Sequence, residues 1–162
     1  MKSKKLILAL IFILIMPIYS YAADSMVVTR GYDPVANIKV IKIVWVDTPS
    51  LTLESQKSGT DNFLAGWYCY FAETIPGSGG AAPQDQYDIV ITNTAGTDIF
   101  GTALTNRSST SKETAIPTVA GSLKGPFPIK PTQLESDALT FTLTNQNNAS
   151  GSGTVYLYFA RY

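Results

Sequence analysis

Histidine is missing altogether from this 162-residue chain, and cysteine occurs only once, as Cys69. Without histidine the chain has no Ser-His-Asp or Cys-His catalytic pair, no His-ligated zinc site and no histidine general base. With a single cysteine, no disulfide forms within one chain. Enzymes built on two carboxylates remain possible, but the closest acidic pairs, Asp85 with Asp88 and Glu135 with Asp137, are expected to be solvated loop charges. We therefore predict no catalytic residues, no cofactor and no enzymatic activity.

Long apolar runs are equally scarce, and the one at the N-terminus is too short to cross a membrane. It extends from Leu6 to Tyr19 and contains Pro17, whereas a spanning helix needs about 20 apolar residues. Three lysines precede it, and Ser20 and Ala22 place small residues at the −3 and −1 positions of a cleavage site. The sequence predicts a signal peptide over residues 1–22 and a secreted or periplasmic protein exported through the Sec pathway, with no stable membrane span after cleavage.

Positive charge is also in short supply once the signal is removed. Three of the 12 basic residues leave with it, so the mature chain has nine basic and 12 acidic residues and a net charge of −3. Binding to nucleic acid requires a basic patch that neutralises phosphates. We therefore expect no nucleic-acid partner, and we expect residues 23–162 to form one domain of ordinary size.

What the mature chain does contain is a series of β-prone segments, with no helix of normal length. An N-terminal edge strand is expected at Met26–Arg30, and a short edge strand at Ser122–Lys124, because the prolines of residues 117–131 disfavour a central strand. Within residues 102–121, Thr102–Asn106 fits one helical turn or an irregular loop. The remaining predicted strands are apolar on one or both faces: Ile38–Val46, Ala65–Thr74, Tyr87–Thr92, Leu139–Thr144 and Thr154–Phe159. The last two are expected to pair as a hairpin across residues 145–153.

The alternation of side chains in these segments predicts which residues face inward. In the run around Cys69, it places Trp67, Cys69 and Phe71 on one face of the strand. Cys69 is then a buried free thiol that acts as a small apolar residue, although a disulfide between two copies stays open. The tyrosines expected outside the core, and so available to a partner or a sugar, are Tyr68, Tyr70, Tyr156 and Tyr158.

Short strands separated by turns, without helices, indicate an all-β fold. We predict an antiparallel β-sandwich of about six to eight strands, of jelly-roll or immunoglobulin-like type, and a small β-barrel is the alternative.

One segment resembles a known group of proteins. Ala82–Gly101 begins with a proline-containing lead into a Tyr87-Asp88 strand, continues through a turn at Gly96 and an Asp98-aliphatic-x-Gly101 step, and is followed by Asn106-Arg107. This pattern resembles small, mostly uncharacterised bacteriophage-type proteins, and the resemblance extends over most of residues 38–160. It implies an all-β fold and a virion-associated or assembly role, without implying a reaction.

The predicted signal peptide departs from that resemblance, because a virion component assembled in the cytoplasm needs no export. Either a secreted bacterial protein has adopted the fold, or a virus delivers this component through the envelope. The alternating C-terminal run Val155–Tyr162 is also similar to that of chaperone–usher pilins. Those pilins usually carry a cysteine pair, which this chain lacks.

The phage-type segment has a physical interpretation of its own. Gly96 permits the positive φ that the tight turn needs, Asp98 is placed to accept backbone N–H bonds after it, and Gly101 lets the chain take a new direction. Arg107 is within reach of Asp98 or Asp88 as a structural ion pair. Asp88, Asn93 and Asp98 have the oxygen ligands that calcium prefers, but their spacing matches no known calcium loop and alternation would divide them between two faces. No metal site is predicted.

Three functions remain open from the sequence. The favoured one is an exported, non-enzymatic structural or assembly protein that forms homo-oligomers or decorates a virion-like or cell-surface assembly. The second is a secreted module that binds carbohydrate or another surface ligand through exposed tyrosines. The third is a hydrolase that uses only carboxylates.

Overall fold

The computed structural model describes residues 25–46, 50–52, 63–64, 66–93, 95–119, 123–124, 127–128, 139–148 and 150–161. The predicted signal peptide, residues 1–22, lies outside the described residues, as does the acidic pair Glu135 and Asp137. Strands dominate the described part of the chain, and its one short helix is the 3-10 turn η2, Gly79–Ala81. No helix among the described residues is long and apolar enough to cross a membrane.

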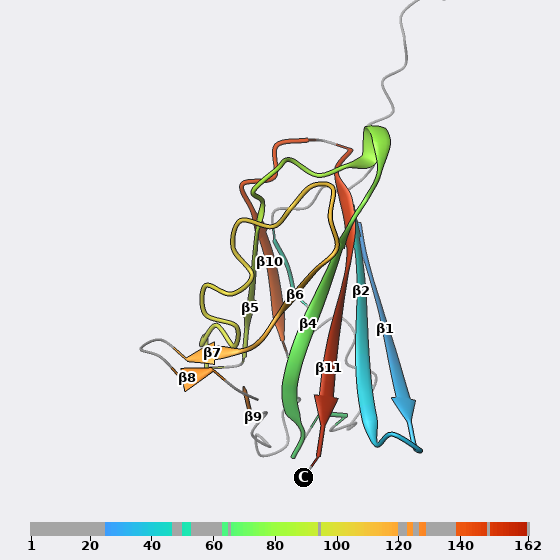
Figure 1. The fold of residues 1–162 in the computed structure, drawn as a ribbon, viewed down its shortest axis with the longest axis vertical. Coiled ribbons are helices and arrows are strands. Elements are labelled where there is room, and N and C mark those ends of the chain that lie inside the picture. The colour runs from blue at the N-terminus through green and yellow to red at the C-terminus, as the bar shows by residue number, and fades with distance from the viewer. Residues whose placement is uncertain are drawn as a thin grey trace, which may run out of the picture.

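The larger of two main sheets has the strand order β1-β2-β11-β4-β6, and β9 also pairs with β4 (Figure 1). All of these pairings are antiparallel. The strands of this sheet are β1 (Ser25–Asp33), β2 (Ile38–Val46), β4 (Tyr68–Pro76), β6 (Glu113–Ala115), β9 (Phe127–Pro128) and β11 (Ser152–Ala160). Among the described strands, β1 and β6 end this row, so the larger sheet is open rather than closed into the alternative barrel.

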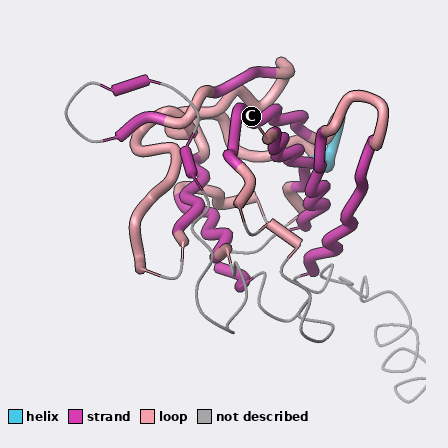
Figure 2. Tube along the Cα trace, turned by 90° about the horizontal axis from the view of Figure 1, so that it is seen from below, coloured by secondary structure: helices cyan, strands magenta, loops and turns pink. Residues whose placement is uncertain are grey.

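The smaller sheet has the order β3-β10-β5 and is also antiparallel. Its strands are β3 (Ser50–Thr52), β5 (Asp88–Thr92) and β10 (Thr140–Thr144), while β7 (Thr118–Val119) and β8 (Leu123–Lys124) form a separate two-stranded ribbon. Figure 2, seen from below, shows the strands of the two main sheets as separate groups.

The core lies between these two sheets, because alternate residues of both point to it. The larger sheet contributes Ile41, Ile43 and Trp45 of β2 and Val155, Leu157 and Phe159 of β11; the smaller sheet contributes Ile89 and Ile91 of β5 and Phe141 and Leu143 of β10. Each of these side chains is at most 5% exposed. The chain is an all-β, antiparallel β-sandwich, as the sequence predicted.

Several local predictions are confirmed. β2 lies between β1 and β11, and β4 lies between β11 and β6, so both are central strands as expected. The N-terminal strand is an edge strand, and β8 matches the short strand expected near Lys124. Residues 102–112 form turns and irregular loop before β6 rather than a helix. Gly96 has a φ of 77°, in the left-handed region expected of it, and Gly101, where the chain was expected to change direction, has a φ of 57°.

The predicted hairpin between the last two long strands is wrong. β10 pairs with β3 and β5, whereas β11 pairs with β2 and β4, so the connection crosses from one sheet to the other. Its polar side chains attach it to a distant loop: Asn148 Nδ2 donates to the carbonyl of Ala82 at 2.6 Å, and Gln146 Oε1 accepts from the backbone N–H of Gln84 at 2.7 Å. Strands with one apolar face satisfy either arrangement, because both sheets turn such a face to the core.

The expected inward position of Phe71 is also wrong, and a β-bulge explains why. In the pairing of β4 with β11, Phe71 lies opposite Tyr158 while Cys69 lies opposite Phe159, so Tyr70 is an extra residue. A bulge of this kind shifts the alternation by one position. Cys69 stays in the core, but Ala72 rather than Phe71 is the next buried residue. Phe71 is thereby moved to the outer face of the larger sheet.

Candidate interaction surface

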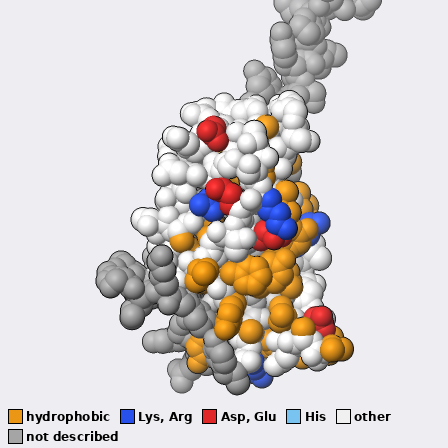
Figure 3. Space-filling model, viewed as in Figure 1, with side chains coloured by type: hydrophobic (Ala, Val, Ile, Leu, Met, Phe, Trp, Pro, Cys, Tyr) orange, Lys and Arg blue, Asp and Glu red, His pale blue; other side chains and the backbone are white. Residues whose placement is uncertain are grey.

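The outer face of the larger sheet, turned away from the core, carries a row of aromatic side chains. Phe71 of β4 and Tyr156 and Tyr158 of β11 are all half-buried there, and together we call them the aromatic face. Tyr158 lies directly opposite Phe71 across the two strands. Figure 3 shows hydrophobic side chains gathered over β4 and β11, with acidic and basic side chains along one border.

The rings of the aromatic face are stacked on one another. The centroids of Phe71 and Tyr158 are 4.2 Å apart with an interplanar angle of 14°, and those of Tyr156 and Tyr158 are 6.4 Å apart at 30°. Lys42 Nζ, on the neighbouring strand β2, lies 5.7 Å from the Tyr156 ring centroid. One surface of the Phe71 ring and one of the Tyr158 ring are therefore covered by each other, which leaves fewer ring faces open to an outside partner.

An ion pair borders the aromatic face. Lys112 Nζ lies 2.6 Å from a carboxylate oxygen of Glu73, a residue of β4. The hydrogen bond to Glu73 raises the pKa of Lys112. Partial burial, followed by the charge of Glu73, raises the pKa of the Tyr158 hydroxyl. Tyr158 therefore stays protonated at neutral pH and is a hydrogen-bond donor at the border of an apolar patch.

A hollow of about 360 Å³ adjoins these rings. Its lining is almost entirely apolar and comes from the β1–β2 turn, β2, β4 and β11. The lining residues are Ala36, Ile38, Tyr70, Phe71, Tyr158, Phe159 and Ala160. The aromatic face thus continues into a concave apolar surface.

The sequence identified part of this surface. Tyr156 and Tyr158 lie on the outer face as expected. Tyr68, opposite Ala160, is half-buried, and Tyr70 is 40% exposed at the bulge. Phe71 was missed, because strict alternation assigned it to the core. No sequence signal marks the bulge, since Tyr70 and Phe71 are equally common in regular strands.

A cluster of cations and aromatic rings lies near the C-terminal end of β11. Lys39 Nζ is 4.4 Å from the Phe63 ring centroid and 4.5 Å from that of Trp67, and it donates to the Phe63 carbonyl. The Arg161 guanidinium lies 5.3 Å from the Trp67 ring, and Tyr32 of β1 packs edge-on against the same ring at 5.9 Å. These contacts attach Phe63 and Trp67 to the larger sheet, a structural role that the sequence did not reveal.

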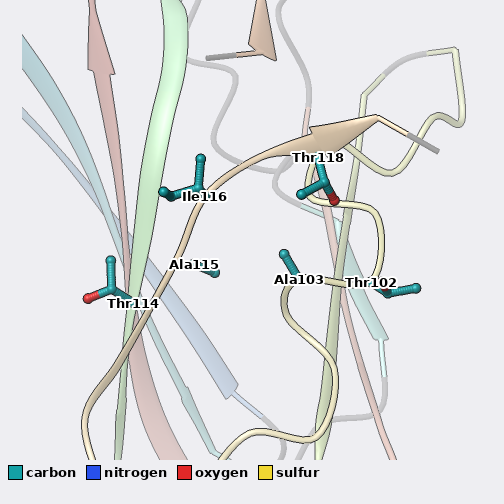
Figure 4. Close-up of a pocket in the computed structure, with 6 residues that line it drawn as sticks. All are labelled: Thr102, Ala103, Thr114, Ala115, Ile116 and Thr118. Atoms are coloured by element: carbon teal, nitrogen blue, oxygen red, sulfur yellow. The ribbon is translucent and has the colours of Figure 1, made fainter. Parts of the chain in front are cut away.

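A second hollow, of about 380 Å³, lies between the β6–β7 segment and the turn at residues 102–103 (Figure 4). It is lined by Thr102, Ala103, Thr114, Ala115, Ile116 and Thr118. Figure 4 shows these side chains approaching from two separate segments. None of these six described residues is ionisable, and they offer hydroxyl groups and apolar surface.

Cys69 is a free, fully buried thiol, as predicted. Burial raises its pKa far above the ordinary value of about 9. A thiol that stays protonated and out of contact with solvent is neither a nucleophile nor a partner for a disulfide between copies.

The three residues considered as calcium ligands do not converge. Asp88 begins β5, whereas Thr92 at its other end forms a bridge with Asp98. Four residues of strand separate these two ends by about 13 Å. Among the described residues, no group of three or more histidine, cysteine or acidic side chains is placed to hold a metal ion.

The oxygens of these residues bind the protein's own backbone and side chains instead. Asp88 accepts from the backbone N–H of Asn106 at 2.7 Å and from the side-chain amide of Asn145. Asp98 accepts from the N–H of Phe100 at 3.0 Å, the kind of bond expected of it, and burial is the main reason that its pKa is raised.

Asn93 closes the turn between β5 and Asp98 in a similar way. Its side-chain oxygen accepts from the N–H groups of Ala95 and Thr97 at 3.0 and 2.9 Å. The turn around Gly96 is thus held by hydrogen bonds to the Asn93 side-chain amide, and it needs no ion to hold its shape.

Arg107 pairs with a different acid from those expected. Its Nε lies 3.6 Å from a carboxylate oxygen of Glu113, and the structure gives it no ion pair with Asp98 or Asp88 among the described residues. Asp85 likewise accepts from the N–H and hydroxyl of Ser109 at 3.1 and 3.3 Å. These acids organise the 105–113 loop, and they do not form a carboxylate pair across a cleft.

No family model, curated protein or solved structure matches this chain. The resemblance to bacteriophage-type proteins and to pilins therefore stays an expectation from the sequence.

Proposed function

We propose that this chain is an exported, non-enzymatic structural or assembly protein that uses the aromatic face to bind another protein subunit. Such subunits form homo-oligomers or decorate a virion-like or cell-surface assembly. The observation that carries the proposal is the stacked row Phe71, Tyr158 and Tyr156 on the outer, non-core face of the larger sheet. Aromatic side chains with a polar border are typical of protein–protein interfaces.

The chemistry of the described residues supports a role without catalysis. The one thiol is buried and protonated. The acids Asp85, Asp88 and Asp98 each accept hydrogen bonds from backbone N–H groups. Residues held in this way stabilise loops, and they lack the free, converging geometry that a carboxylate-based hydrolase needs.

The ring geometry favours a protein partner over a sugar. A sugar stacks on an exposed aromatic ring surface, because its C–H groups contact the π cloud. Here the Phe71 and Tyr158 rings are nearly parallel at 4.2 Å and cover each other. Ring edges and the adjoining apolar hollow suit the side chains of another protein better.

The test compares the mature protein, residues 23–162, with variants in a concentration series by size-exclusion chromatography with light scattering. We expect oligomers in the unaltered protein and a smaller assembly in Phe71→Ser and Tyr158→Ser. Ile116→Ser is the matched control, because it removes an exposed apolar side chain (52% exposed) from a different part of the surface. Circular dichroism of each variant separates lost assembly from lost folding.

A protein that stays monomeric at every concentration, or oligomers whose size is unchanged by both substitutions in the aromatic face, would contradict the proposal. Glycan-array binding that disappears in Tyr156→Ala and Tyr158→Ala would replace it with the carbohydrate-binding alternative.

A further inference from the structure

β1 is a long and regular edge strand. All nine of its residues pair with β2 without a register shift, and among the described strands it pairs with no other. Figure 1 shows β1 at the margin of the larger sheet. Met26 and Val28 pack against the core, while Val27 on the opposite face is 59% exposed.

β1 lacks most of the features that usually prevent edge strands from pairing with other molecules. Its sequence, SMVVTRGYD, contains no proline and no lysine, its pairing shows no bulge, and its charged residues are Arg30 and Asp33. Proline, charged residues (lysine above all), bulges and short length are the common protections of a sheet edge. A nine-residue edge that pairs with one described strand and has few of these protections is suited to pairing with a partner strand.

We infer that β1 pairs antiparallel with β1 of a second copy of this chain, about a two-fold axis at Thr29. The two larger sheets then join into one continuous sheet. This inference deepens the proposed assembly role, on which its functional meaning rests, by naming the partner and the edge through which it binds.

Symmetry and charge together select the register. In a two-fold antiparallel pair the axis passes between a residue and its own copy, because residues directly opposite each other carry side chains on the same face of the sheet. An axis at Thr29 pairs all nine residues with one another. An axis at Arg30 would place two guanidinium groups directly opposite, which is unfavourable. An axis at Val28 would leave Tyr32 and Asp33 without a partner inside the strand.

The register at Thr29 also matches side chains of suitable size and polarity. The exposed Val27 lies opposite Gly31 of the second copy, whose missing side chain leaves space. The Ser25 hydroxyl, a donor, lies opposite the Asp33 carboxylate, an acceptor. Like charges are not directly opposite at any of the nine positions of this register.

The joined sheet would present two copies of the aromatic face on the same side. A two-fold axis perpendicular to the sheet keeps the outer faces of both copies in one direction. Thr29 lies opposite Lys42 of β2, and Lys42 in turn lies over the Tyr156 ring. The dimer edge and the aromatic face are thus two distinct parts of one continuous surface.

Cysteine crosslinking tests this register directly, because the native Cys69 is buried and does not compete. In Thr29→Cys the two introduced residues face each other at a Cα separation of about 4.5–5.5 Å, within disulfide range. In Val27→Cys, the matched control on the same face, the two cysteines are about 13 Å apart, which is too far for a disulfide. We expect a disulfide-linked dimer of Thr29→Cys on non-reducing gels under mild oxidation, and monomer for Val27→Cys.

Failure to crosslink at position 29, equal crosslinking at both positions, or preferential crosslinking at position 27 would overturn the inference. A second variant does not depend on oxidation. Thr29→Lys places like charges on the axis and should weaken dimerisation several-fold with an unchanged melting temperature, whereas Ile116→Lys should leave dimerisation as it is. Dimerisation unaffected by Thr29→Lys would also count against the inference.

The two proposals fail in different ways. If Thr29→Cys still crosslinks in a Tyr158→Ser background, the edge pairing is correct whatever the role of the aromatic face. If Thr29→Cys stays monomeric on gels while Tyr158→Ser abolishes a larger oligomer, the edge pairing is wrong and the proposed function stands.

Discussion

Gly153 is the position in this sandwich where a single added methyl group should cost the most. It lies on β11 directly opposite Trp45 of β2, on the core side of the sheet. A Cβ atom at Gly153 would come within 2.6 Å of Trp45 Cζ2, 2.8 Å of Cε2 and 3.0 Å of Nε1. The indole therefore occupies the space that a side chain at Gly153 would need.

The magnitude follows from two opposing effects. Alanine restricts the unfolded chain more than glycine does, which stabilises by about 0.4–1 kcal/mol where the backbone conformation is permitted. Against this, the fully buried indole would have to move, and overpacking of a core costs about 1–3 kcal/mol. We expect Gly153→Ala to lower the free energy of unfolding by about 1–2 kcal/mol.

The assay is urea unfolding followed by far-ultraviolet circular dichroism. Gly80→Ala is the control, because a Cβ atom there meets nothing within 4 Å, and its effect should stay within about 0.5 kcal/mol. Trp45→Phe tests the cause: it removes the atoms that would clash, and also the indole N–H, which finds no acceptor among the described residues.

In the Trp45→Phe background, Gly153→Ala should cost at least about 1 kcal/mol less than in the unaltered protein. Equal costs in both backgrounds, or a Gly153→Ala variant as stable as the original chain, would refute the reasoning.

Two further predictions concern buried ionisable groups. The Cys69 thiol should be unreactive toward a thiol reagent at pH 8 until urea unfolds the chain, and rapid labelling of the native protein would contradict its burial. Burial raises the pKa of Cys69 above the unfolded value of about 9, and it raises the pKa of Tyr87 to about 12. The contribution of each group to stability is therefore complete at neutral pH and is lost as pH rises from the unfolded pKa toward the folded pKa, by up to about 1.4 kcal/mol per pH unit. Cys69→Ala should remove the part of this loss that begins near pH 9 in a series of unfolding curves. Asp98→Asn keeps an oxygen that accepts from the Phe100 N–H and removes the partly buried charge, so this variant should be at least as stable as the original chain at pH 7. Asp98→Ala loses the acceptor and should lower the free energy of unfolding by about 1–2 kcal/mol. Equal losses in the two variants would show that the charge itself is needed.

The layers of the fold could be predicted because alternation is a local property of the chain. In the buried parts of β2 and β5, every second residue is apolar and buried. The buried face of such a strand can be predicted from its own residues, without knowing which strands lie beside it. The same local logic identified the turn glycines Gly96 and Gly101, since only their own backbone angles decide them. The partners of a strand are not local, which is why β10 and β11 were wrongly joined as a hairpin.

The aromatic face shows how such a non-local feature changes the site. The bulge at Tyr70 depends on how β4 aligns with β11, roughly 90 residues later in the chain, and the run of aromatic residues around it reads equally well in either alternation. One inserted residue moves Phe71 from the expected core position to a stacked contact with Tyr158, and it brings Ala72 inward in its place. Because an alanine then fills the core position, the bulge exchanges a large buried ring for a small side chain and places the ring on the outer face. Regular pairing would have buried the Phe71 ring, and we expect a ring displaced to the outer face in this way to take part in binding another subunit. The Phe71→Ser variant tests that expectation with little disturbance of the core.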